Sequence, residues 1–241
     1  MSTFNEVDFI RSAKKEDTDK EGVTGCDKKV VAFIDVLGVT SRVKNRESTE
    51  EVVKEIRKIR GFTRKMMKEL RIEPSVTMLA VSDCLIFATE IEKKNDLIAL
   101  LSYLQHFCLC EDQPILLRGA IAFGDVCIEE AGTQIMGPAY VTAYLLQEKI
   151  AEYPRIIMSD TILGHVKKDI ICKMCDDIPA IDFIEVLEKR KISAVQSIKH
   201  KNIISKLNEK NKEYESRPDL DFSIRKKYGW MIRYLKEKVL L

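Results

Sequence analysis

Blocks of apolar and polar residues alternate along the chain in a pattern that predicts an α/β domain. Residues 30–34 are apolar without interruption, which is typical of a strand buried on both faces, so we expect a strand over 28–36 that ends before Gly38. Apolar residues then recur at helical spacing from Val52 to Leu70, which predicts a long amphipathic helix. A strand followed by a long helix indicates the start of a layered fold.

Two short β-prone runs follow, at 75–81 and 84–89, and only Ser82 and Asp83 separate them. This spacing predicts a tight hairpin with an aspartate at its tip. Later patterns predict a helix over 95–110, a second hairpin over 115–128 that turns at Gly124 and Asp125, a helix over 137–152, a strand over 155–158, a short helix from Asp160 and a strand over 180–186.

The pattern divides the chain into three parts. Residues 1–27 are polar without a sustained period, and we interpret them as a mobile arm. Residues 28–190 carry the predicted strands and form the main domain. Residues 191–241 are charged and helical, with a break at Pro218 and an apolar stripe that we expect to pack on the body or on a second chain.

Composition excludes several classes of function. The 241 residues are 45% hydrophobic and have a formal net charge of +2, so a single core is expected and no global field attracts nucleic acid. The chain lacks about 18 consecutive apolar residues and a signal-peptide pattern, so we expect no membrane insertion and a cytoplasmic location.

The cysteines add little chemistry. Their number is odd, seven, and Cys84, Cys108 and Cys127 lie in apolar stretches, so we expect reduced thiols and no disulfide framework. Cys172 and Cys175 have the spacing of half a zinc site, but no second pair follows, and we interpret them as ordinary thiols.

Asp35 and Asp83 are the strongest candidates for chemistry. One ends a predicted buried strand, and the other lies at the tip of a hairpin that can pair beside it. Two carboxylates at such a place repel unless a cation lies between them, and oxygen ligands favour Mg²⁺ or Mn²⁺. The competing interpretation is that Asp35 caps a turn and that Asp83 is an ordinary turn residue.

The segment after Asp35 suits phosphate binding. Gly38 lets the backbone turn sharply, so the amides of Val39 and Thr40 can face an anion. We therefore expect a phosphate cradle next to the metal site, although no Walker sequence is present.

Five segments in order carry a resemblance to a known family: residues 33–38 (FIDVLG), Ser82-Asp83, residues 117–121 (LRGAI) with Gly124, residues 137–140 (GPAY) and residues 154–157 (PRII). They resemble class III nucleotidyl cyclase catalytic domains, and more closely the bacterial antiphage pyrimidine cyclases of the Pycsar system. The resemblance covers about 29–190, and residues 224–230 are similar to the tail of that group. It implies a ferredoxin-like α/β sandwich, with a mostly antiparallel sheet, helices on one face and a C-terminal helical extension.

The resemblance also implies a reaction. Asp35, Asp83 and the backbone carbonyl of Val36 would hold two Mn²⁺ or Mg²⁺ ions, and the ribose 3′-hydroxyl would attack the α-phosphate and release pyrophosphate. Such domains work as homodimers with the nucleoside triphosphate at the interface. The implied product is a cyclic pyrimidine nucleotide that acts as a second messenger in antiphage defence, with UTP preferred to CTP as the substrate.

The chain departs from the better-known cyclases at four positions. Leu79 stands where adenylyl cyclases have a purine-reading lysine, and Gln134 stands at the position of the second purine reader. Val141 and Leu145 align with an asparagine and an arginine that orient ribose and phosphate. Arg118 and Arg155 are candidates to substitute as phosphate contacts, because a planar guanidinium suits phosphoryl oxygens. Ordinary strand-end salt bridges are the alternative for both.

The departures leave two other functions open. One is a catalytically silent, cyclase-like module that binds nucleotide and dimerises. The other is a purine cyclase with unusual base contacts.

Overall fold

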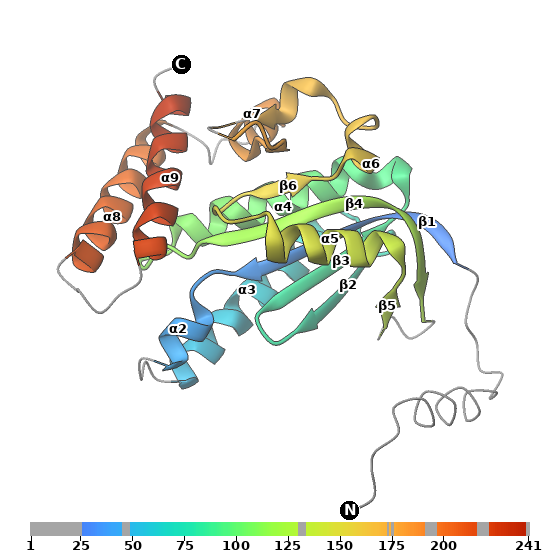
Figure 1. Ribbon diagram of the computed structural model, residues 1–241, viewed down its shortest axis with the longest axis horizontal. Coiled ribbons are helices and arrows are strands. Elements are labelled where there is room, and N and C mark those ends of the chain that lie inside the picture. Colours follow the sequence, from blue (N-terminus) through green and yellow to red (C-terminus); the bar gives the residue numbers. More distant parts are fainter. Residues whose placement is uncertain are drawn as a thin grey trace, which may run out of the picture.

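A twisted sheet of eight strands forms the centre of the protein in the computed structural model (Figure 1), which describes residues 26–44, 49–129, 134–172, 174, 176–190, 197–215 and 222–239. The strand order is β2-β3-β1-β4-β6-β8-β7, with β5 paired to β4. Among the described strands, β4 and β6 alone pair in parallel, so the sheet is mostly antiparallel. The strands are β1 Asp27–Val36, β2 Val76–Val81, β3 Cys84–Thr89, β4 Leu117–Ile128, β5 Ile135–Met136, β6 Ile156–Met158, β7 Ile171–Cys172 and β8 Ala180–Ile181.

Helices cover both faces of this sheet. Alternate β1 residues, including Ala32 and Ile34, face the main core with α3, α4 and α7, whereas Val31 and Phe33 face a smaller cluster beneath α5. The expectation of helices on one face therefore holds for the main layer and is wrong for α5. The helices are α2 Val39–Lys44, α3 Thr49–Glu69, α4 Lys94–Cys110, α5 Pro138–Lys149, α6 Asp160–Leu163, α7 Phe183–Lys189, α8 Ser197–Glu215 and α9 Phe222–Val239, with short 3₁₀ turns η1 Ile91–Lys93 and η2 Lys168–Ile170.

The hairpin predicted over 115–128 is instead one strand, β4. Gly124 and Asp125 pair with Lys29 and Lys28 of β1 rather than forming a turn. The long β1 strand offers hydrogen-bond partners along the whole segment, so tertiary pairing overrides the local turn signal of a Gly-Asp pair.

The strand predicted over 180–186 ends at Ile181 in the structure, so the prediction is wrong for the residues after it. Asp182 caps the N-terminus of α7, because its carboxylate accepts a hydrogen bond from the Glu185 amide. The apolar residues Phe183 and Val186 are then buried on one face of a helix rather than along a strand.

One pair of cysteines corrects the expectation of reduced thiols. Cys26 and Cys127 form a disulfide, with their Cα atoms 4.3 Å apart. The register of β1 and β4 places Asp27 opposite Val126, which brings the two cysteines side by side although 101 residues separate them. Cys175 lies outside the described residues, so the half zinc site stays untested.

The C-terminal helices α8 and α9 pack on the body (Figure 1). Leu207 of α8 and Met231 and Leu235 of α9 are buried in the main core. None of the described helices is long and apolar enough to cross a membrane. The arm expected over 1–27 lies almost wholly outside the described residues.

Candidate metal and nucleotide site

Strand pairing brings Asp35 and Asp83 together. Asp35 lies near the end of β1 opposite Cys84 of β3, and Asp83 precedes Cys84 at the tip of the β2–β3 hairpin. One ligand atom each from Asp35, Asp83 and Cys84 lie within 4.8 Å of one another. The Val36 amide also donates to the Asp83 carbonyl oxygen at 3.4 Å, which ties the hairpin tip to the end of β1.

The geometry of the hairpin tip aims Asp83 at β1. Ser82 has a φ of 51°, so the two-residue connection turns through the left-handed region. The Arg60 guanidinium of α3 donates to the Ser82 carbonyl oxygen. The helix layer therefore supports the turn from outside the site.

Two side chains from other elements hold Asp35. Arg118 lies opposite Asp35 on β4, and its Nε donates to Asp35 Oδ2 at 2.9 Å. Gln147 of α5 donates its side-chain amide to the same oxygen at 3.3 Å. Burial raises the pKa of Asp35, and the Arg118 hydrogen bond and charge oppose that shift.

The approach of β4 to β1 depends on a glycine. A Cβ on Gly119 would lie 2.6 Å from the Phe33 carbonyl oxygen, so this position has no room for a side chain. The close strand pairing holds Arg118 beside Asp35.

Cys84 is the third member of the cluster, but its chemistry differs. Burial, together with the neighbouring Asp35 and Asp83 charges, raises the pKa of the Cys84 thiol to about 12. A protonated thiol is a poor ligand, and hard cations prefer oxygen. The two carboxylates are therefore the donors that suit Mg²⁺ or Mn²⁺.

We expect Cys84→Ala to leave the affinity for Mn²⁺ within about twofold of the wild-type value at neutral pH, because a hard cation prefers the carboxylate oxygens of Asp35 and Asp83 to a sulfur ligand. Titration calorimetry with Mn²⁺ checks this. Cys108→Ala, in the buried core, is the matched thiol control. A loss of Mn²⁺ affinity of tenfold or more in Cys84→Ala alone would make Cys84 a ligand.

A cavity of about 410 Å³ lies beside the two aspartates. Val36, Gly38 and Val39 line it, and Gly38 has a φ of 88°, as the expected sharp turn requires. Arg118 lines it as well, and Thr40 follows Val39 in α2. The remaining lining residues are Leu37, Arg42, Glu55, Gln113, Pro114, Ile115, Leu116, Lys210, Tyr214, Ser223, Ile224, Lys227 and Tyr228.

Three predicted contacts lie outside this cavity. Arg155 is 2% exposed and forms a bidentate ion pair with the Asp176 carboxylate. This is the ordinary salt bridge that was the alternative to a phosphate contact. Leu79 of β2 packs against the smaller core cluster beneath α5. Gln134 precedes β5 and is exposed.

Several residues of the site carry no sequence signal that predicts their place in it. Gln147 carries no motif, and only the helical face that it shares with Ala143 signals that it points toward the sheet. Arg42, Lys210 and Lys227 come from three helices and converge only through the tertiary fold.

Comparisons with known proteins agree on the fold. No protein-family model and no curated protein sequence matches this chain. A bacterial light-regulated adenylyl cyclase is similar over 76% of this chain and 65% of its own length, with 12% identity and a TM-score of 0.50. The catalytic core of a rhodopsin-guanylyl cyclase with converted specificity, in complex with ATPαS, is similar over 64% of this chain and 94% of its own, with 15% identity and a TM-score of 0.51.

A third solved structure is the non-canonical dimeric guanylyl cyclase domain of a fusion protein from the aquatic fungus Blastocladiella emersonii. It is similar over 65% of this chain and 93% of its own, with 13% identity and a TM-score of 0.50. At such identities the likeness shows the fold: the chain has the fold of nucleotidyl cyclase catalytic domains. The predicted fold class is confirmed.

Proposed function

We propose that this chain is a metal-dependent nucleotidyl cyclase that converts a pyrimidine nucleoside triphosphate, UTP in preference to CTP, to the 3′,5′-cyclic monophosphate and pyrophosphate. The observation that carries the proposal is the meeting of Asp35 and Asp83 beside a cavity of about 410 Å³, on a fold shared with cyclase catalytic domains. A volume of this order lies in the range of small-molecule sites.

The donor set fits two Mn²⁺ or Mg²⁺ ions. Asp35 and Asp83 supply the carboxylates, and the backbone carbonyl of Val36, which lines the cavity, is a further candidate. When bound, such ions lower the pKa of an attacking hydroxyl and stabilise charge on a leaving phosphate oxygen.

The chain's own groups then position the substrate. Backbone amides of Val39 and Thr40 after the Gly38 turn bind phosphate oxygens, and the Arg118 guanidinium binds the α-phosphate. The 3′-oxygen bonds to the α-phosphorus as the bond from that phosphorus to the bridging β-oxygen breaks. The hydroxyl proton passes to solvent, and pyrophosphate leaves.

The base contacts come, in this proposal, from a second copy of the chain. Leu79 and Gln134 lie outside the cavity of their own chain, as expected if they act across an interface. Apolar side chains also stay exposed on this side of the fold: Val81 at the end of β2, Met136 of β5, and Val141, Tyr144 and Leu145 of α5. One solved structure of the fungal guanylyl cyclase domain is a non-canonical dimer, and another is a monomer. We therefore propose a homodimer with the nucleotide between its subunits.

A catalytically silent module is the second candidate. Val141 and Leu145, at the positions where the resembled cyclases carry asparagine and arginine, are 43% and 38% exposed and apolar. In that case the chain binds nucleotide and dimerises without turnover. A purine substrate is also compatible with the similar solved structures, which include adenylyl and guanylyl cyclases.

The test of the substrate is a parallel incubation of the purified chain with UTP, CTP, ATP and GTP in Mn²⁺, followed by mass analysis of the products. We expect cyclic UMP to form at least about tenfold faster than cyclic AMP or cyclic GMP, which corresponds to about 1.4 kcal/mol of discrimination. A dominant purine product contradicts the pyrimidine assignment. The role in antiphage defence rests on the resemblance to the Pycsar cyclases alone.

A further inference from the structure

The C-terminal helices form part of the cavity that holds the aspartate pair. Lys210 and Tyr214 of α8 line it, together with Ile224, Lys227 and Tyr228 of α9. Tyr214 and Tyr228 pack with ring centroids 5.3 Å apart, and Tyr228 is only 8% exposed. The C-terminal helices α8 and α9 therefore form one side of the cavity.

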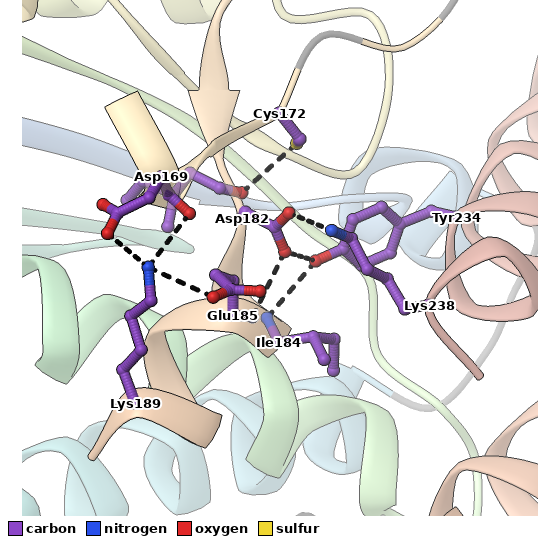
Figure 2. Close-up of polar contacts among 9 residues, drawn as sticks. Asp169, Cys172, Asp182, Ile184, Glu185, Lys189, Tyr234 and Lys238 are labelled. Atoms are coloured by element: carbon purple, nitrogen blue, oxygen red, sulfur yellow. Dashed lines mark hydrogen bonds and ion pairs between the residues drawn. The ribbon is translucent and has the colours of Figure 1, made fainter. Parts of the chain in front are cut away.

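A buried polar network fixes α9 to the main domain (Figure 2). Asp182 accepts a hydrogen bond from the Tyr234 hydroxyl at 2.8 Å and forms an ion pair with Lys238. The Tyr234 oxygen in turn accepts from the Ile184 amide at 3.3 Å. Tyr234 lies two helical turns after Lys227, on the same face of α9, so the network also fixes where Lys227 projects.

Aromatic stacking adds to this anchor. Trp230 of α9 stacks between Tyr153 and Tyr234, with ring centroids 5.9 and 5.7 Å away. The Arg155 guanidinium lies 5.7 Å from the Trp230 ring centroid. Aromatic stacking and the Asp182 ion pair together hold α9 in place, so Lys227 on its cavity side has a defined position.

Positive charge exceeds negative charge in the lining. Asp35 and Glu55 each have a cationic partner there, because Arg118 donates to the first at 2.9 Å and Arg42 to the second at 2.7 Å. The lysines of α8 and α9 add two further cations. The lining thus contains four cations, Arg42, Arg118, Lys210 and Lys227, against three carboxylates, Asp35, Glu55 and Asp83.

Lys210 has two described contacts: an ion pair with Glu213 and a ring contact with Tyr214, whose centroid lies 5.4 Å from the Lys210 Nζ. The Lys210 Nζ lies 2.9 Å from Glu213, one helical turn away, and the Glu213 side chain is 50% exposed. Such solvent-exposed pairs contribute little free energy. Lys210 can therefore exchange this contact for a more highly charged anion in the cavity.

We infer that Lys210 and Lys227 bind the β- and γ-phosphates of the nucleoside triphosphate, which makes the C-terminal helical pair part of the substrate site. The inference rests on the proposed function for the identity of the ligand. The α-phosphate must lie at Asp35 and Asp83 for cyclisation, so the rest of the triphosphate extends from there into the cavity. Lysines on α8 and α9 then neutralise the phosphates that leave as pyrophosphate.

The test uses binding as well as turnover. Calorimetry with Mn²⁺ and inorganic tripolyphosphate measures the cavity directly in the full chain. We expect Lys210→Gln and Lys227→Gln each to weaken tripolyphosphate binding about tenfold, the loss of one charge-assisted contact, and Lys→Arg at either position to restore most of it. In turnover, the same Gln variants should raise KM for the triphosphate by a similar factor.

Matched controls are on the same helices. Lys212→Gln on α8 and Lys226→Gln on α9 remove the same charge from residues that do not line the cavity, and we expect both to bind tripolyphosphate like the wild type. Circular dichroism confirms that each variant is folded.

The outcomes separate this inference from the proposed function. If tripolyphosphate binding depends on the two lysines but no cyclic product forms, the polyphosphate site is supported and the cyclase assignment is contradicted. Cyclic product with unchanged KM and unchanged tripolyphosphate affinity in Lys210→Gln and Lys227→Gln overturns the inference and leaves the cyclase. Faster turnover in these variants also overturns it, because α8 and α9 would then obstruct the site rather than bind the substrate.

Discussion

Replacing Asp83 by Asn is expected to lower the rate of nucleotide cyclisation about a thousandfold. The variant keeps the shape of the side chain but removes one of two carboxylates that approach within 4.8 Å. Loss of about 4 kcal/mol of stabilisation of the transition-state charge corresponds to that factor. Mn²⁺ affinity, measured by calorimetry, should fall in parallel.

Asp83 is a cleaner test than Asp35. Asp35→Asn should abolish turnover too, but it also leaves the half-buried Arg118 without its ion-pair partner, so stability falls along with metal binding. Asp125→Asn, an exposed aspartate on β4, serves as the control for the charge change. Full activity and unchanged Mn²⁺ affinity in Asp83→Asn would contradict the assignment of the metal site.

The second large effect is on stability. Asp182→Ala is expected to lower the free energy of unfolding by about 3 to 5 kcal/mol, because the buried carboxylate caps α7, accepts from Tyr234 and pairs with Lys238. The chain has a single tryptophan, Trp230, and it lies in α9. Urea unfolding followed by Trp230 fluorescence therefore reports on the helix that loses its anchor.

Asp169→Ala is the matched control for this variant. Asp169 also pairs with a lysine, Lys189, in the same region (Figure 2), but its side chain is 55% exposed. We expect little change in the urea unfolding midpoint, because a solvent-exposed ion pair contributes little to stability. Equal unfolding midpoints for Asp182→Ala and Asp169→Ala would show that the network does not hold α9.

Local patterns in the sequence are enough to predict much of the fold around the two aspartates. The uninterrupted apolar run before Asp35 required a strand buried on both faces, and β1 is that strand. The two-residue spacing between 81 and 84 left room only for a hairpin, which placed Asp83 at its tip. The two aspartates could be paired from the sequence because both lie where an element ends.

Pairing between segments that are distant in the sequence determines the features that local patterns do not predict. Gly124 and Asp125 look like a turn, yet β1 binds them as a strand, and the same register joins Cys26 to Cys127. Lys210 and Lys227 lie among many charges typical of a solvated helix, and no periodicity distinguishes them from Lys212 or Lys226. Only the docking of α8 and α9 over the end of β1 singles them out.

The stoichiometry of products from the wild-type chain with UTP and Mn²⁺ tests directly whether the chain is a pyrimidine nucleotide cyclase. Cyclisation predicts cyclic UMP and pyrophosphate in equal amounts, with no UDP and no inorganic phosphate, and neither product from Asp83→Asn. UDP with inorganic phosphate, or the absence of any product with all four nucleotides, would contradict the assignment of this chain as a cyclase.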